Sequence, residues 1–321
     1  MCFLIGHPGA NILAFRHHMH GMQGNHIHVG LFLLVVIASS LSPVFGWCVA
    51  DWSAALRTQP LDQPLVITKT IGRLPSDFPA GILYKAGPAR FENEGSGTAY
   101  AHWLEGDGAV ARLELNPLSS NCADFTFKFV ETELFRDERR EGKVLTRGTF
   151  GTNKDEGINA FDFRLRNPCN TNAVRVGDKV LALSEVGLPQ VLDPDTLEAQ
   201  GVETFGDRLV DGAPAATLGV LGFIDSALGF GDAVCAHHRE IDGRHVFVSM
   251  RQNAVTDATC LTLLEIDSHS GDVVSETESE LENTGFPPHD WVVTPNYAAF
   301  VATPAGGNLI PFLIGLKGPA E

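Results

Sequence analysis

Basic residues are scarce in this chain. It has 23 Lys and Arg against 39 Asp and Glu, which gives its 321 residues a formal charge of −16. No stripe of Lys and Arg interrupts the acidic background, so a phosphate backbone would meet net repulsion. We therefore expect no nucleic-acid partner.

Several motifs of common enzyme classes are also missing. The six cysteines form no Cys-x-x-Cys pair and have no zinc-type spacing. There is no Gly-x-Ser-x-Gly elbow, no Walker loop, and no Gly-x-Gly-x-x-Gly between a strand and a helix. These absences argue against a disulfide framework, a serine hydrolase elbow, a P-loop and a dinucleotide-binding fold. Isolated disulfide bridges stay open at this point.

Beyond residue 60 the sequence has no amphipathic helix pattern of ordinary length and is rich in strand patterns. Residues 109–116 and 125–132 alternate with period two, and the latter puts Phe125, Phe127 and Phe129 on one face. Similar runs, separated by turns rich in Gly, Asp and Pro, occupy residues 179–185, 245–250, 261–267 and 297–303. The sequence predicts an all-β chain that folds as a sandwich, a barrel or a propeller.

The first fifty residues differ from the remainder. Residues 7–28 carry six of the twelve histidines, and residues 29–50 carry no charge. The run LFLLVVIA has the length of a signal-peptide core, and CVA before Asp51 offers small residues for cleavage, so we predict a signal or organelle presequence. The uncharged run is also long enough to cross a bilayer, which leaves a signal anchor as the alternative. We divide the chain into a leader, 1–50, and a folded part, 51–321.

Three residues of metal-site type recur at equal intervals. Glu185 precedes His237 by 52 residues, and His237 precedes His289 by 52. An interval close to one propeller blade favours a propeller, whose successive blades project equivalent residues toward one axis. Two imidazoles beside a carboxylate suit a transition metal. In the structural alternative, His289 is a turn residue placed by two prolines, His237 is a core imidazole, and Glu185 is a strand-end carboxylate in water.

Four sequence blocks resemble the carotenoid cleavage oxygenases, the family that includes the retinal pigment epithelial membrane protein. The first joins GRLPSDFPAGILYKAGPARFE (72–92) to AHWLEGDGAVARLEL (101–115). The second is NPCNTNAVRVGDKVLALSEVGLPQVLDPDTLEAQG (167–201), and CAHHREID (235–242) and HDWVVTPNYAAF (289–300) follow in order. The resemblance spans roughly residues 60 to 304, which makes it more specific than any single motif.

The resemblance implies a fold, a metal and a reaction. The fold would be a seven-bladed β-propeller, present here as an incomplete N-terminal part, with Fe(II) on its axis. His237 and His289 would be the first two iron ligands, and Glu185 would be a carboxylate behind a ligand, so that all three serve catalysis. The reaction would be O₂-dependent cleavage of a carotenoid or apocarotenoid double bond. Such an apolar polyene substrate implies peripheral membrane contact, and with the leader it suggests a plastid or another membrane-bounded organelle.

The sequence departs from the family pattern in three ways. The family's third and fourth iron histidines lie in a C-terminal portion that this chain lacks, and His269, in a hydrophilic turn, is not expected to replace them. We therefore expect a fragment that is inactive and poorly soluble by itself. His238 stands where the family commonly has proline and offers a competing ring. Residues 211–232 are longer than the usual link, and we interpret them as an insertion, for which contact with a membrane is one candidate role.

Other functions remain open from the sequence alone. Within the family, stilbene cleavage and retinoid ester isomerisation fit the same residues. From another class, a non-catalytic propeller that binds partners or lipids would use the histidines structurally. A translated relic without function is the third alternative.

Overall fold

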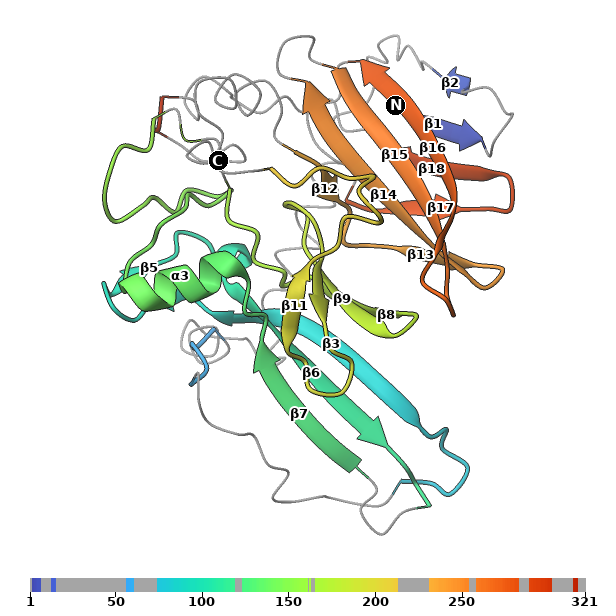
Figure 1. Cartoon of the computed structure of the whole chain (residues 1–321), viewed down its shortest axis with the longest axis horizontal. Coiled ribbons are helices and arrows are strands. Elements are labelled where there is room, and N and C mark those ends of the chain that lie inside the picture. Colours follow the sequence, from blue (N-terminus) through green and yellow to red (C-terminus); the bar gives the residue numbers. More distant parts are fainter. Residues whose placement is uncertain are drawn as a thin grey trace, which may run out of the picture.

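The computed structural model describes residues 2–6, 13–15, 56–60, 74–118, 123–160, 162, 165–212, 231–253, 258–282, 289–301 and 314–316. These residues are mostly strands, arranged in antiparallel sheets that follow one another along the chain (Figure 1). The expected strand-rich fold is confirmed.

The first large sheet has the order β3-β6-β7. Its strands are β3 (Gly81–Arg90), β6 (Asp107–Leu115) and β7 (Ala123–Phe129). The short strands β4 (Glu92–Asn93) and β5 (Thr98–Ala99) and the 3-10 turn η1 (Trp103–Glu105) lie between β3 and β6. The predicted Phe face is confirmed at its inner end, where Phe127 and Phe129 meet edge to face at 5.9 Å.

The expectation of no ordinary helix is wrong for residues 133–141. This segment forms α3 (Glu133–Glu141), which the Thr132 hydroxyl caps by accepting from the Phe135 N–H at 3.1 Å. The helix ends at Gly142, whose φ of 64° is left-handed. All of its residues except Leu134 and Phe135 are charged, so it has no apolar stripe for a sequence pattern to detect.

The second sheet is a four-stranded meander with the order β11-β10-β9-β8. Its strands are β8 (Asn172–Val176), β9 (Lys179–Leu183), β10 (Gln190–Leu192) and β11 (Ala199–Val202). Four consecutive residues of β9, from Val180 to Leu183, are fully buried. A strand buried on both faces lies between two packed layers, so this sheet occupies the middle of the described structure.

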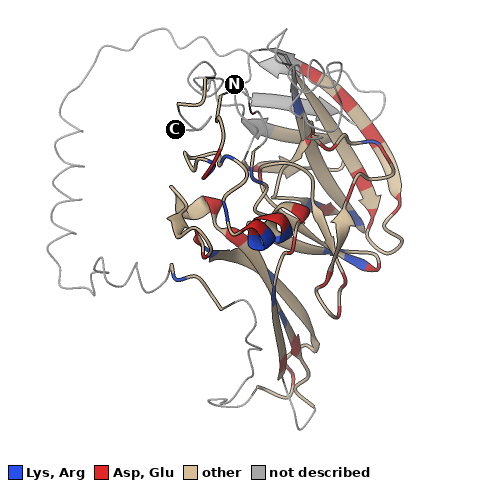
Figure 2. Cartoon of the chain, turned by 60° about the vertical axis from the view of Figure 1, so that its left-hand side comes forward, with Lys and Arg blue, Asp and Glu red and all other residues tan. Residues whose placement is uncertain are grey.

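The third sheet is formed by β12 (Ala233–Val234), β14 (Arg244–Asn253), β15 (Ala258–Asp267) and β16 (Val273–Glu282), with β13 (Arg239–Ile241) paired to β14. Glutamates at alternate positions of β16 are exposed, as the red bands of Figure 2 show; they are Glu276, Glu278 and Glu280. Within the described residues β16 is an edge strand, and like charges along an edge disfavour pairing with another chain.

The fourth sheet joins segments from the two ends of the sequence. Its order is β17-β18-β1-β2, with β17 (Trp291–Val293), β18 (Tyr297–Val301), β1 (Cys2–Gly6) and β2 (Leu13–Phe15). β1 pairs antiparallel with the whole of β18. The remaining leader residues lie outside the described residues, so the division into leader and folded part stays a prediction. No described helix has both the length and the apolar character needed to cross a bilayer.

Three of the four apolar clusters among the described residues are shared by two neighbouring sheets, and the fourth joins the first sheet to α3. Ala86 and Val110 of the first sheet pack with Val180 and Leu192 of the second. The same relation joins the second sheet to the third through Leu181 and Phe247, among others. Trp291 and Ala298 of the fourth sheet pack with Val248 and Leu261 of the third. Face-to-face packing of consecutive antiparallel meanders is the arrangement of propeller blades.

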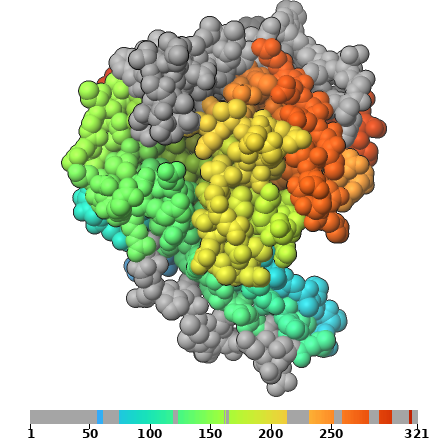
Figure 3. All heavy atoms as spheres, viewed as in Figure 1, coloured from blue at the N-terminus to red at the C-terminus, as the bar shows by residue number. Residues whose placement is uncertain are grey.

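The surface shows the same order of segments. In Figure 3 the yellow atoms of the segment that ends at residue 212 lie between the green atoms near residue 150 and the orange atoms of the third sheet. Charged side chains as well as apolar ones are buried beneath this surface. Arg166, with 1% of its side chain exposed, forms ion pairs with Asp107 at 2.5 Å and with Glu138. This pairing ties α3 to the first sheet and to the chain that enters the second.

Candidate metal centre

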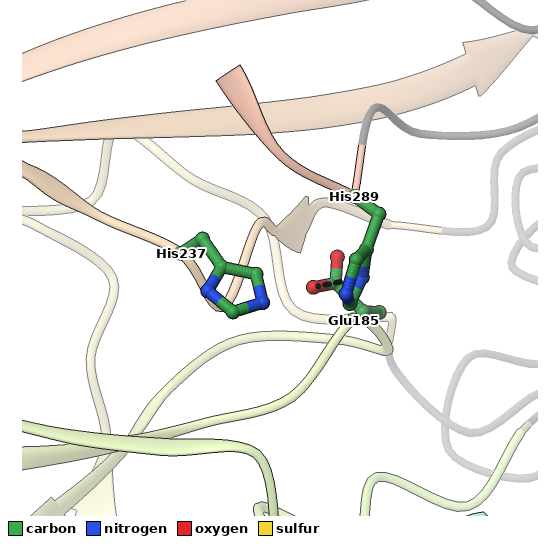
Figure 4. A group of neighbouring side chains, drawn as sticks. All are labelled: Glu185, His237 and His289. Carbon is green, nitrogen blue, oxygen red and sulfur yellow. Dashed lines mark ion pairs between the residues drawn. The ribbon is translucent and has the colours of Figure 1, made fainter. Parts of the chain in front are cut away.

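Three consecutive sheets each contribute one side chain to a common point. Glu185 lies just after β9 of the second sheet, His237 lies between β12 and β13 of the third, and His289 lies two residues before β17 of the fourth. Figure 4 shows the three side chains pointing toward one another. The equal spacing in sequence therefore corresponds to one residue from each of three consecutive sheets.

The three side chains are close enough to share one ion. The Nδ1 atom of His289 lies 3.1 Å from Oε1 of Glu185. The rings of His237 and His289 have centroids 4.7 Å apart and are nearly perpendicular, at 82°. One ligand atom from each residue lies within 4.8 Å of the other two. The convergence predicted from the sequence is present, whereas the role of the histidines as ligands stays a prediction.

The carboxyl group of Glu185 is partly buried, and only one of its oxygens has a hydrogen-bond partner among the described residues. Its Oε1 atom accepts a hydrogen bond from the Ala236 N–H at 3.3 Å, and its buried Oε2 has no hydrogen-bond partner among the described residues. Burial, together with the charge of Asp290 and against the lowering effect of the Ala236 N–H, raises the pKa of Glu185 to about 7. A buried carboxylate of this kind gains from a nearby cation.

The histidine of the third sheet is held in its neutral form. Burial lowers the pKa of His237, and the neighbouring ring of His289 lowers it further. A neutral imidazole has a nitrogen lone pair for a metal, so a lowered pKa favours coordination near pH 7. His289 is the open side of the site, because 70% of its side chain is exposed.

Hydrogen bonds fix the spacing of the two histidine segments, which are the segments that carry His237 and His289. Trp291, which is 3% exposed, donates from Nε1 to the carbonyl oxygen of His237 at 2.7 Å. Arg239 donates from Nε to the carbonyl of Trp291 at 2.7 Å and also forms an ion pair with Asp290. The sequence analysis did not identify these residues as part of the site, although Asp290 and Trp291 directly follow His289 in the block 289–300 that resembles the family.

The thiol of Cys235 makes a second contact between the two histidine segments. Cys235 lies within hydrogen-bond reach of the His289 carbonyl, with its Sγ at 3.4 Å. Burial raises the pKa of Cys235 to about 12, and the charge of Glu185 acts in the same direction. The group is therefore a neutral thiol at pH 7 and not a thiolate ligand.

Other residues singled out in the sequence lie elsewhere. His238 belongs to a separate cluster with Glu240 and His245, so it does not compete with His237 for the same point. His269 is in an exposed turn, where its Nδ1 lies 3.2 Å from the Ser268 hydroxyl. The prolines before His289, the histidines of segment 7–28 and most of the long link, 213–230, lie outside the described residues.

Comparison with known proteins gives consistent matches. The family described as Retinal pigment epithelial membrane protein matches residues 56–317. Apocarotenoid-15,15'-oxygenase of Synechocystis sp. is 31% identical over 277 residues, which cover 84% of this chain and 51% of that protein. The chloroplastic carotenoid cleavage dioxygenase 7 of Oryza sativa subsp. japonica is 35% identical over 145 residues, which cover 43% of this chain and 22% of that protein.

Solved structures show the same similarity. A cobalt-substituted Synechocystis apocarotenoid oxygenase superposes with a TM-score of 0.68 and 30% sequence identity, covering 84% of this chain and 53% of the other. The chain thus spans about half the length of the Synechocystis protein. A structure with cobalt in place of its own metal implies a metal site in that oxygenase. The similarity confirms the expected β-propeller architecture for the part of the fold that the chain covers.

Proposed function

Because the chain belongs to the family of the retinal pigment epithelial membrane protein and the carotenoid oxygenases, we propose that it serves oxidative cleavage of a conjugated double bond in a carotenoid or apocarotenoid. The proposed metal is non-haem Fe(II), bound by His237 and His289. The observation that carries the proposal is the convergence of these two imidazoles and Glu185 from three consecutive sheets.

The residues at this point fit an iron ion. Imidazole nitrogen suits Fe, and a ligand histidine commonly gives its outer N–H to a carboxylate. Glu185 Oε1 faces Nδ1 of His289 at 3.1 Å, which supplies that carboxylate. Its partnerless, buried Oε2 is a further sign that the site is built around a positive charge. When bound, Fe(II) supplies the redox chemistry that allows O₂ to react with a polyene.

Each protein group then has a defined task. Glu185 is placed to accept a hydrogen bond from Nδ1–H of His289, which fixes the tautomer and leaves Nε2 as the metal-binding atom. The lowered pKa of His237 keeps its ring unprotonated. Trp291 and Arg239 hold the backbone of the two histidine segments, so the rings need little rearrangement to bind the ion.

The test is iron binding by the purified chain and by two variants. Metal analysis after anaerobic loading with Fe(II) should show iron in the wild type and its loss in both His237→Ala and His289→Ala. His269→Gln, a change in an exposed turn, is the matched control and should retain iron. If both alanine variants keep the iron content of the wild type, the proposed centre is wrong and the histidines are structural, as a non-catalytic binding propeller would require.

A second measurement addresses the reaction. The iron-loaded protein is mixed with an apocarotenal and O₂, and the aldehyde products are separated and identified by mass. Turnover that disappears in His237→Ala would support the proposed cleavage directly and would overturn the expectation that the 321-residue chain is inactive by itself. Turnover that persists in His237→Ala would contradict the assigned role of the metal ligand.

The location of the protein is part of the same proposal. We propose that the leader directs the chain to a plastid or another membrane-bounded organelle, where it contacts a membrane that holds the polyene. The support is the uncharged run 29–50 and the apolar nature of the substrate class. A fluorescent fusion of residues 1–50 should enter such an organelle, and a cytosolic signal would contradict the proposal.

A further inference from the structure

A second group of histidine and glutamate side chains lies on the hairpin formed by β13 and β14. The turn of this hairpin is Asp242-Gly243, and both residues have positive φ, 49° and 74°. Such a two-residue turn sets the register of the strands, which places Glu240 directly opposite His245. Opposite residues of an antiparallel pair share one face of the sheet, so these two side chains meet.

His238 completes the group from the same face. It lies two residues before Glu240, and its ring stacks on Phe247 with centroids 5.6 Å apart and an angle of 25° between the rings. Phe247 is fully buried, so this stacking gives the imidazole a rigid support. The rings of His238 and His245 have centroids 5.3 Å apart.

The spacing of the ligand atoms matches a metal site better than a hydrogen-bonded group. Oε1 of Glu240 lies 3.5 Å from Nε2 of His238 and 3.5 Å from Nδ1 of His245. The first contact lies at the outer limit of a hydrogen bond, and the second does not form one. Ligands placed tetrahedrally at about 2.1 Å from a zinc ion lie about 3.4 Å from one another. All three ligand atoms of the group lie within 4.8 Å of one another.

One buried atom of the group has no partner. The side chain of His245 is 6% exposed, and its Nδ1 has no hydrogen-bond partner among the described residues. A hydrogen bond to the backbone of Arg175 engages the ring as well. If that bond uses the other ring nitrogen, the lone pair of Nδ1 faces a carboxylate oxygen, and the two repel unless a cation lies between them. Burial also lowers the pKa of His245, which disfavours a proton as that cation.

We propose that His238, Glu240 and His245 form a second metal site, which takes a divalent transition metal of the zinc type. Two imidazole nitrogens and one carboxylate oxygen form a ligand set that zinc accepts, with water as the fourth ligand. His238 would coordinate through Nε2, the ring nitrogen that faces Glu240.

The site is independent of the proposed iron centre. His237 and His238 are adjacent in sequence, but they belong to separate groups that share no residue. The hairpin site would join β13 to β14 next to the segment that carries His237. It goes beyond the proposed oxygenase function and does not require it.

The experiment measures Zn²⁺ binding by the full chain through thermal unfolding. An ion that binds only the folded protein raises the unfolding temperature, whereas histidines that bind equally in both states do not. Glu240→Gln removes a direct ligand at an exposed position, since 68% of its side chain is accessible. We expect it to weaken the Zn²⁺ affinity of this site by at least about 10- to 100-fold, the loss already caused by changing the outer partners of ligands.

Matched variants separate the two sites. Glu280→Gln, an exposed strand glutamate outside both groups, should keep the full response to Zn²⁺. The hairpin response should persist in His289→Ala and be lost when Glu240→Gln is added to it. Co²⁺ in place of Zn²⁺ should give visible absorption bands of a tetrahedral site in His289→Ala that disappear in the double variant.

The outcomes that overturn the proposal are distinct from those that overturn the iron centre. A Zn²⁺ response equal in Glu240→Gln and wild type, together with cobalt bands that survive the double variant, would show that the hairpin holds no metal. His245→Gln tests the same point through the buried ligand, and Glu240→Gln keeps the test valid if that variant fails to fold. An iron content insensitive to His289→Ala bears on the first site alone.

Discussion

Trp291 offers a direct test of how the two histidine segments are held together. Its indole N–H donates to the carbonyl oxygen of His237 at 2.7 Å, and the residue is 3% exposed. Trp291→Phe keeps an aromatic ring in the core between β17 and the third sheet but removes this donor. The change therefore separates the hydrogen bond from most of the apolar packing.

The expected cost is the sum of two effects. A buried acceptor left without its donor costs about 1–3 kcal/mol. The smaller ring leaves a gap and sits further from the Arg239 guanidinium, now 5.8 Å from the ring centroid, which adds about 1 kcal/mol. We expect the free energy of unfolding of the metal-free protein to fall by about 2–4 kcal/mol.

Urea unfolding followed by circular dichroism measures this difference, with an unchanged denaturant slope as the sign of a pure stability effect. Trp103→Phe is the control, because that residue is 49% exposed and its loss should change stability by less than about 0.5 kcal/mol. Trp291→Phe should also weaken iron binding, because the carbonyl group of His237 loses its hydrogen bond from the indole. Equal stability of the two variants, or unaltered iron affinity in Trp291→Phe, would refute the proposed role.

Three further predictions concern other parts of the molecule. Glu185→Gln should weaken iron binding by about 10- to 100-fold, measured by competition with a chelator. The raised pKa of Glu185 means that the folded wild type holds a proton more tightly than the unfolded chain. Its stability should therefore fall as pH rises from 4.5 to about 7, and urea unfolding of metal-free Glu185→Gln should lack this component of the fall. Thr132→Ala removes the cap of α3 and should cost about 1 kcal/mol, whereas Thr132→Ser should cost less, as thermal unfolding would show. Arg166→Met leaves the buried carboxylates of Asp107 and Glu138 without their shared cation and should cost about 3–5 kcal/mol in urea unfolding; a smaller cost than that of Thr132→Ala would contradict this reading.

The strands were predictable where local sequence determines them. The runs that became β6, β7, β9, β14, β15 and β18 alternate or cluster apolar residues between turn residues. β16 was missed because its sequence, VVSETESELE, puts Ser275, Thr277 and Ser279 on the face opposite the glutamates, so its alternation contains little hydrophobicity. α3 was missed because charge surrounds it on nearly every side.

The three residues of the candidate site were predictable from the sequence, but the hydrogen bonds that hold them in place were not. Spacing and family resemblance both indicated Glu185, His237 and His289, and the structure brings them together. The ties through Arg239 and Trp291 depend on the approach of segments more than fifty residues apart, which no local pattern encodes. The hairpin group was within reach of the sequence, because an Asp-Gly turn at 242–243 is enough to place Glu240 opposite His245.

The most direct test of the central claim is anomalous X-ray scattering at the iron edge, measured from crystals of the chain loaded with Fe(II). The account predicts an iron peak within about 2.0–2.3 Å of one ring nitrogen from each of His237 and His289, with Glu185 beside the outer nitrogen of His289. A site between these rings without an iron peak, or a peak bonded to neither of them, would contradict it.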